Sequence, residues 1–163
     1  AKEFVKFKER CLVRLLGDMR SYNYVIIPTH DFDKIIYKIR AIDFDQQSFE
    51  GNLKVYNLQF LKENFKIVEM VNRKLDNNSI NQYKLEERSF MAKRMISSPR
   101  RASSLIECMK NDSISFDNNI QLLKKQLIKY VGDVKFKECQ NMGDILETIL
   151  VFVKRNYQDV LTK

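Results

Sequence analysis

Acidic and amide side chains form two short groups in the first third of the chain. Asp18 and Asn23 come just before a run rich in β-branched residues, and Asp43 and Asp45 come directly after a second such run. Carboxylate and amide oxygens are the ligands that a hard cation such as Mg²⁺ prefers, usually together with the phosphate oxygens of a substrate. The pattern predicts a magnesium site if the fold brings the two groups together.

A β-hairpin is the element that is expected to do so. Residues 24–28 and 34–42 are predicted to be its strands and 29–33 its turn, because a polar turn between β-branched runs is typical of hairpins. In an antiparallel pair, the start of the first strand lies beside the end of the second. The two polar groups are therefore expected to converge at the open end of the hairpin.

The spacing of these residues resembles a known catalytic arrangement. Asp18-Met-Arg-Ser-Tyr-Asn23 has the D-x-x-x-x-N spacing of a protein-kinase catalytic loop, and Asp43-Phe44-Asp45 stands where the D-F-G aspartate would be. Leu16-Gly17-Asp18 and Ala41-Ile-Asp-Phe-Asp45 are similar to the aminoglycoside-phosphotransferase and choline-kinase branch of the protein-kinase-like superfamily. That branch usually has H-G-D-x-x-x-x-N and then I-D-F/W-D/E.

The resemblance implies a role for each of these side chains. Asp18 would orient the hydroxyl acceptor or accept its proton. Asn23 and Asp43 would bind the Mg²⁺ that accompanies ATP or GTP, and Asp45 would support the site. Arg20, inside the loop, would contact substrate or phosphate, or form a tethering ion pair. The implied partners are a nucleotide and a hydroxyl acceptor that the sequence does not identify.

The chain departs from the family pattern in two ways. Leu16 stands where the family usually has His. The chain has four glycines, so no Gly-rich phosphate loop can be written, and only a short segment precedes Asp18. The resemblance therefore implies a C-terminal lobe. The matching N-terminal lobe would belong to deleted sequence or to another subunit, and in the first case the chain would be a fragment of a longer one.

The rest of the chain is expected to be helical. Apolar periodicity predicts helices over about residues 3–11, 57–75, 79–97, a short one after Pro99, 116–131 and one from about 142. Asn57 and Ser79 are the predicted N-caps and Gly132 a C-cap, while 134–136 is predicted to be extended. The fold class is therefore α+β and mostly α. A single domain, 1–163, would have an N-terminal β-hairpin packed against four or five helices, like a kinase-like C-lobe.

Composition sets limits on the partners. The formal net charge of +8 favours attraction to polyanions. Nucleic acid is an unlikely partner, because the best basic cluster lacks the interleaved aromatic residues used for base stacking; it consists of Lys93, Arg94, Arg100 and Arg101.

Three distant cysteines favour a reducing compartment. No apolar run approaches membrane-spanning length, so no membrane partner and a cytoplasmic location are expected.

Three hypotheses remain open at this point. The first is the kinase-like phosphotransferase lobe. The second is a non-catalytic helical module of the same fold that binds a partner or serves as a scaffold. The third is a basic nucleic-acid-binding domain. Against all three stands a purely structural interpretation, in which Asp18 and Asn23 only cap the loop or form Asx-turns.

Overall fold

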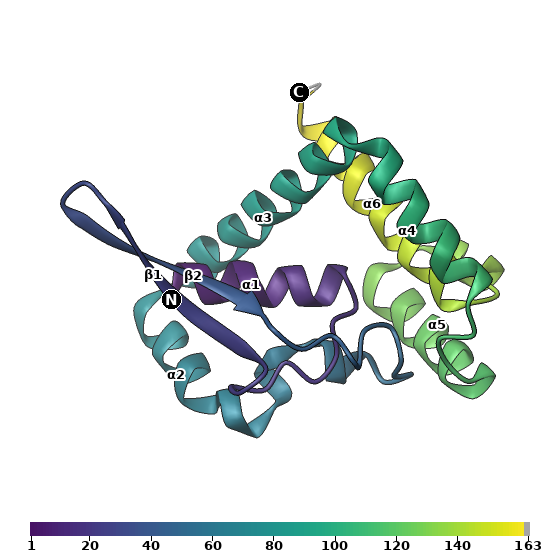
Figure 1. The fold of residues 1–163 in the computed structure, drawn as a ribbon, viewed down its shortest axis with the longest axis horizontal. Coiled ribbons are helices and arrows are strands. Elements are labelled where there is room, and N and C mark those ends of the chain that lie inside the picture. The colour runs from purple at the N-terminus through teal and green to yellow at the C-terminus, as the bar shows by residue number, and fades with distance from the viewer. Residues whose placement is uncertain (162–163) are drawn as a thin grey trace.

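The structure, a computed structural model, describes the backbone of residues 1–161. Apolar periodicity also predicts that Val160 and Leu161 lie on the buried side of the last helix, but their side chains are outside the described part. The predicted α+β, mostly helical class is confirmed (Figure 1). The elements are α1 (Lys2–Val13), β1 (Tyr24–Asp31), β2 (Lys34–Ala41), α2 (Phe65–Lys74), α3 (Asn77–Ser97), α4 (Pro99–Asn111), α5 (Asp117–Val131) and α6 (Met142–Leu161).

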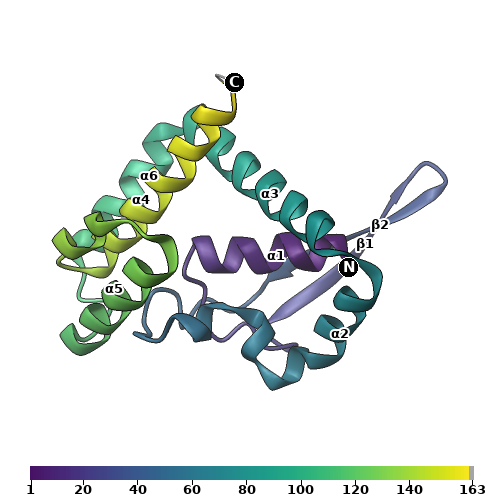
Figure 2. The same ribbon diagram turned by 180° about the vertical axis from the view of Figure 1, so that it is seen from behind.

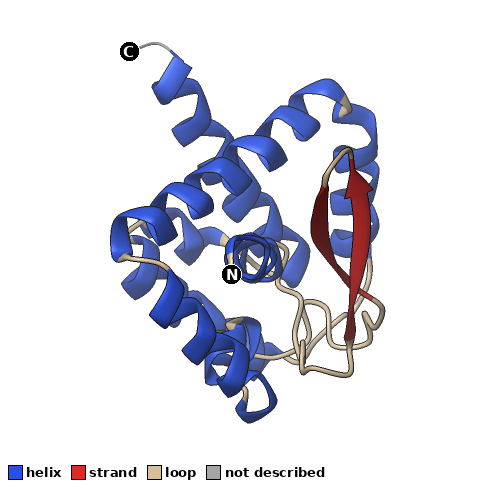
Figure 3. Ribbon diagram, turned by 90° about the vertical axis from the view of Figure 1, so that its left-hand side faces the viewer, coloured by secondary structure: helices blue, strands red, loops and turns tan. Residues whose placement is uncertain are grey.

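The hairpin is longer than predicted. β1 and β2 pair antiparallel from Tyr24 opposite Ala41 to Asp31 opposite Lys34. The predicted turn over 29–33 is therefore wrong in its first three residues, which belong to β1. The oppositely charged pair Asp31 and Lys34 extends the ladder to a two-residue turn at 32–33. The tip projects past the helices (Figures 1 and 2), and the strands stand to one side of them (Figure 3).

Two hydrophobic clusters fill the interior. The N-terminal cluster joins α1 to the root of the hairpin and to α2; its buried members are Phe4, Val5, Phe7, Cys11, Leu16, Met19, Tyr24, Ile39, Leu58 and Val71. The C-terminal cluster is centred on α5 and α6; its buried members are Val13, Leu15, Tyr56, Ala92, Ile120, Leu123, Leu127, Phe136, Cys139, Met142, Ile145, Ile149 and Val153. Because α1 ends in the C-terminal cluster, it links the two.

Helix α3 is the second link between the clusters. Ile80 and Tyr83 near its start pack against the N-terminal cluster. Ala92, further along, is fully buried in the C-terminal cluster. The apolar side chains of α3 therefore do not form one stripe, because its two ends face different cores. Phe90, which periodicity predicts to point inward, is instead exposed.

Buried charges fix α3 on α1. The Arg88 side chain donates from Nε to Glu9 Oε1 at 2.5 Å, and Arg10 Nη1 donates to Glu87 Oε1 at 3.1 Å. Glu9 and Glu87 are 2% and 3% exposed. A buried carboxylate without a partner is strongly destabilising, so these pairs hold the two helices in one register.

The predicted helix over 57–75 is wrong in its first half. Three 3₁₀ turns precede α2, at Leu53–Tyr56, Leu58–Phe60 and Lys62–Asn64. Asn57 has extended backbone angles and makes no side-chain cap hydrogen bond to the turn that follows. The apolar periodicity of this segment comes from side chains that anchor successive short turns.

Three smaller expectations also fail. The segment predicted to be extended forms the 3₁₀ helix Val134–Glu138, with the Asp133 carboxylate accepting from the Lys135 amide. Phe116 and Tyr130, predicted to face the core, are exposed. α3 begins before Ser79, because Asp76 is its cap and accepts the Ser79 N–H.

The helix stops are predicted correctly. α4 begins at Pro99 after Ser98, and α5 ends at Val131 with Gly132 as its cap, at φ of 78°.

Among the described residues, no helix has both the length and the apolar composition needed to cross a membrane.

Candidate functional site

The Asp18 loop connects α1 to β1 and is tightly wound. Asp18 has φ of 52°, a left-handed conformation that costs free energy for a residue with a Cβ atom. Its carbonyl oxygen accepts hydrogen bonds from the Arg20 N–H and from Asn23 Nδ2, both at 2.7 Å. The turn therefore fixes Asp18 and Asn23, the ends of the D-x-x-x-x-N spacing, against each other.

The carboxylate of Asp18 is held on both oxygens. Arg20 Nε donates to Oδ1 at 2.6 Å, and Asn23 Nδ2 lies 3.4 Å from Oδ2. Arg20 also donates to Glu63 at 3.1 Å. The hydrogen bond to Asp18 raises the pKa of the Arg20 guanidinium. Of the two roles predicted for Arg20, the structure shows the tethering ion pair.

The Asn23 side chain is oriented by the same loop. It is buried, and its amide nitrogen points to Asp18. No hydrogen bond in the described part of the chain involves its Oδ1 atom. An amide held by its nitrogen presents its oxygen on the other side, which is the atom that a hard cation would bind.

The segment after β2 lies beside this loop and is attached to it at both ends. The Ile42 N–H donates to the Asn23 carbonyl at 3.0 Å, which extends the hairpin ladder by one residue. At the other end, Leu16 forms an antiparallel bridge with Gln47. A Cβ atom on Gly17 would lie 2.6 Å from the Gln46 carbonyl oxygen, so only glycine fits there without movement. Residues 42–47 therefore run alongside the loop.

Backbone strain concentrates where these two segments meet. Four non-glycine residues have positive φ among the residues that the structure describes, and three of them are Leu15, Asp18 and Ser48. The Ser48 N–H donates to the Leu15 carbonyl at 2.8 Å. Strained backbone persists only where the surroundings over-determine it, and it clusters at functional sites.

The structure brings together the backbone, but not all the side chains, of the predicted site. Asp43 Oδ1 accepts the Asp45 N–H at 3.1 Å, a local turn of the Asx type. Among the described hydrogen bonds and ion pairs, none joins the Asp43 carboxylate to Asp18 or Asn23. The Asp45 carboxylate is exposed. The side chains of Asp18 and Asn23 are thus in contact. Asp43 is near them only because the preceding residue, Ile42, donates its N–H to the Asn23 carbonyl.

A buried amide supports the loop from below. Asn64 is fully buried and donates to the carbonyls of Met19 and Leu58 at 2.9 and 3.2 Å. Its oxygen accepts the Tyr24 hydroxyl at 3.0 Å. No local sequence pattern marks this positioning residue, because Tyr24 and Met19 lie 40 and 45 residues upstream of it.

A metal ion at this loop would have few protein ligands. Within the described residues, no group of three or more His, Cys, Asp and Glu side chains is placed to hold a metal ion. The predicted set has an amide and carboxylates from two segments instead. Mg²⁺ commonly takes one or two carboxylates and completes its shell with waters and phosphate oxygens, so a set of this size would be enough only for a cation whose other ligands come from water or a substrate.

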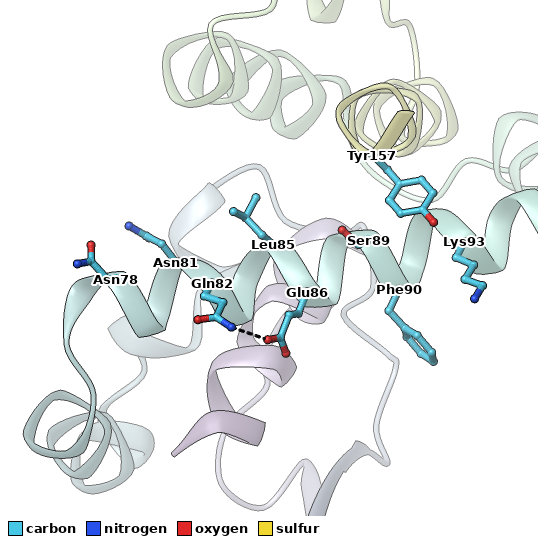
Figure 4. A pocket seen from close by; sticks show the side chains of 9 residues that line it. All are labelled: Asn78, Asn81, Gln82, Leu85, Glu86, Ser89, Phe90, Lys93 and Tyr157. Atoms are coloured by element: carbon cyan, nitrogen blue, oxygen red, sulfur yellow. Dashed lines mark hydrogen bonds between the residues drawn. The ribbon is translucent and has the colours of Figure 1, made fainter. Parts of the chain in front are cut away.

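The hollow in Figure 4 is separate from this site. It runs along α3, and Tyr157 of α6 reaches toward it (Figure 4). Its lining is mostly neutral, with three amide side chains, and Gln82 donates to Glu86 within it. None of the predicted site residues lines it: the lining is Asn78, Asn81, Gln82, Leu85, Glu86, Ser89, Phe90, Lys93 and Tyr157.

Comparisons with known proteins give this chain no relative. No protein family, curated protein or solved structure matches it.

Proposed function

We propose that this chain carries the acceptor- and metal-binding part of a kinase-like phosphotransferase site. In this proposal a Mg²⁺-bound nucleoside triphosphate, ATP or GTP, gives its terminal phosphoryl group to a hydroxyl acceptor. Asp18 serves the acceptor, and Asn23 and Asp43 serve the metal.

One observation carries the proposal. The loop from Gly17 to Asn23 and the segment from 42 to 47 are attached at both ends, by the close approach of Gly17 to Gln46 and by the Asn23–Ile42 hydrogen bond. A phosphoryl-transfer site needs an acceptor-orienting carboxylate and metal ligands from two segments held in fixed register. The double attachment supports that requirement.

Each side chain has a distinct task in the proposed site. The Asp18 carboxylate, tethered by Arg20, accepts a hydrogen bond from the acceptor hydroxyl and takes its proton as the new phosphate bond forms. The free Asn23 oxygen and the Asp43 carboxylate are the candidate ligands for Mg²⁺. The metal, when bound, neutralises charge on the phosphate oxygens.

The nucleotide also needs contacts that these residues do not provide. Few side chains are required once the phosphates are positioned, but no Gly-rich phosphate loop can be written in this sequence. In the proposal, those contacts come from an N-terminal lobe or a partner subunit. The acceptor carries a hydroxyl group, and its further chemistry stays open.

Titration calorimetry with ATP, in the presence and absence of Mg²⁺, tests the proposal. Binding is expected to require Mg²⁺ and to weaken about tenfold or more in Asp43→Asn. Asp18→Asn is expected to bind as the unaltered chain does, because Asp18 serves the acceptor. The matched control is Asp31→Asn, a carboxylate at the hairpin tip, which should change nothing. Binding that does not require Mg²⁺, or binding that Asp43→Asn leaves intact, contradicts the proposal.

A further inference from the structure

The outer edge of β2 carries backbone groups that no other strand uses. The hydrogen bond from Ile42 N–H to the Asn23 carbonyl sets the phase of the hairpin ladder. In that phase Ile35, Tyr37 and Ile39 are in non-hydrogen-bonded pairs, so their N–H and C=O groups point away from β1. Within residues 1–161 the sheet has two strands, so this edge has no strand of the described chain beside it.

Helix α1 already occupies one position of this edge. Glu3 Oε1 accepts the Ile39 N–H at 3.4 Å, and Arg10 Nη2 donates to the Ile39 carbonyl at 3.1 Å. Side chains thus replace a neighbouring strand at the root of the hairpin. Toward the tip, the outward groups of Tyr37 and Ile35 have no such partner among the described residues.

The opposite edge of the hairpin is protected. Pro28 lies opposite Tyr37, and proline has no N–H to offer where β1 faces outward. Proline on an edge is a common device against strand addition. β2 has no proline, so the two edges differ in their capacity to accept a further strand.

Cations without a carboxylate partner line a groove beside the root of this edge. A groove of about 710 Å³ runs between β2, α1 and α3, and four of its cationic side chains have no carboxylate partner in the described part of the chain. These are Arg14, Lys38, Arg40 and Arg94.

Apolar side chains accompany the cations. Ile35 and Tyr37 are 52% and 55% exposed on the same face of β2 as Ile39. Phe44 and Phe90 line the groove and are also exposed. A partner for this surface needs three properties: backbone groups at strand spacing, negative charge and apolar side chains.

We propose that the outer edge of β2 and the adjoining basic groove bind an extended, acidic segment of another polypeptide, which adds to the hairpin as a third strand. The outward groups of Ile35 and Tyr37 pair with its backbone. Its carboxylates meet Lys38, Arg40 and Arg94, and its apolar residues cover Tyr37. A nucleic acid would satisfy the cations but not the strand edge. This binding is independent of the nucleotide chemistry proposed above.

Fluorescence anisotropy and amide exchange together test this surface. The probe is a fluorescein-labelled octapeptide of alternating Glu and Val. A peptide of alternating Glu and Pro keeps the charge but cannot pair as a strand. The Glu–Val peptide is expected to bind the full chain and to slow hydrogen exchange at the Ile35 and Tyr37 amides, whereas the Glu–Pro peptide should bind at least about tenfold more weakly.

Two pairs of variants separate the contribution of the β2 backbone edge to peptide binding from that of the cationic side chains. Tyr37→Pro removes an N–H that the hairpin does not use and should weaken binding about tenfold more than Tyr37→Thr, which keeps it. Arg40→Glu should weaken binding, and Arg73→Glu on α2 should not. Circular dichroism checks that each variant folds, and the exchange measurement on the unaltered chain does not depend on any variant.

Three results would overturn the proposal. The first is binding of the Glu–Val peptide without protection at Ile35 and Tyr37, or no binding at all. The second is a uridine 20-mer RNA that binds more tightly than the peptide through the same arginines. The third is a dimer in analytical ultracentrifugation that Tyr37→Pro abolishes, because a second copy would then occupy the edge.

Discussion

The hairpin and the α5–α6 pair bury their apolar side chains to very different extents. On α5 and α6, Leu123 and Ile145 are fully buried, and their apolar neighbours in the C-terminal cluster are nearly so. On the hairpin, only Tyr24 and Ile39 are buried, whereas Ile26 and Ile36 are about half exposed. The difference indicates that the helices supply most of the free energy of folding, whereas the hairpin leaves most of its apolar side chains exposed to solvent or to a partner.

The junction between these regions combines features of both. Leu15 belongs to the C-terminal cluster and Leu16 to the N-terminal cluster, and the Asp18 loop follows directly. A strained loop needs rigid support on both sides. The candidate site therefore lies where two cores can fix the backbone, while its carboxylates remain accessible.

Matched isoleucine truncations should give the largest contrast. Ile145→Ala is expected to lower the free energy of unfolding by about 3 kcal/mol, because it leaves a cavity in the C-terminal cluster. Ile35→Ala on the hairpin should cost less than about 1 kcal/mol. Urea denaturation measures both. Equal costs would show that the hairpin is packed as tightly as the helical core, contrary to the comparison.

The buried ion pair between α1 and α3 should matter nearly as much. Arg88→Met leaves the Glu9 carboxylate buried without its partner and is expected to cost about 3 kcal/mol. The double variant Glu9→Leu with Arg88→Met should recover most of that loss, since neither charge then remains. If the double variant is no more stable than Arg88→Met, desolvation of Glu9 is not the cause. Thermal unfolding at neutral pH is the measurement.

Two glycine substitutions should separate a steric clash from backbone strain. Gly17→Ala places a Cβ atom against the Gln46 carbonyl and is expected to cost about 2 kcal/mol. Gly132→Ala meets no atom within 4 Å but has φ of 78°, and should cost about 1 kcal/mol. Gly17→Ala should also weaken Mg²⁺-dependent ATP binding, whereas Gly132→Ala should leave it unchanged.

The reaction rates of the three cysteines should show which of the two hydrophobic clusters opens more easily, without a change in stability. Cys108 is exposed and should react quickly with Ellman's reagent at pH 8. Burial raises the pKa of the Cys11 thiol to about 12, so little thiolate is present at that pH. Cys139 is also buried, in the C-terminal cluster. If the N-terminal cluster opens more easily, Cys11 should react before Cys139, and Cys108→Ser should remove only the fast phase.

The sequence was sufficient for elements with strong local signals. The Ser98–Pro99 start of α4 and the glycine that ends α5 are examples, because each depends on the residue's own backbone chemistry. The segment 57–64 was not predictable in this way. Asn64 is held there by the distant carbonyl of Met19, and such long-range hydrogen bonds leave no periodic pattern.

The candidate site was predictable only in part, for the same reason. The antiparallel hairpin predicts that the start of the first strand lies beside the end of the second, and Asn23 and Ile42 do pair there. Their exact register depends on the two-residue turn after Asp31, which the sequence did not predict. The direction of the Asp43 carboxylate depends on a local turn with Asp45, and the second partner of Arg20, Glu63, comes from a distant 3₁₀ turn. Neither contact follows from residue spacing.

Paramagnetic NMR with Mn²⁺ in place of Mg²⁺ tests whether the metal binds between the Asp18 loop and the segment after β2. In a ¹⁵N-labelled sample with ATP, Mn²⁺ broadens the amide signals close to the metal, even when binding is weak. We expect selective broadening of residues 18–23 and 42–45, absent without ATP and lost in Asp43→Asn. Broadening centred elsewhere, for example on the basic cluster of Lys93, Arg94, Arg100 and Arg101, or no selective broadening, would contradict it.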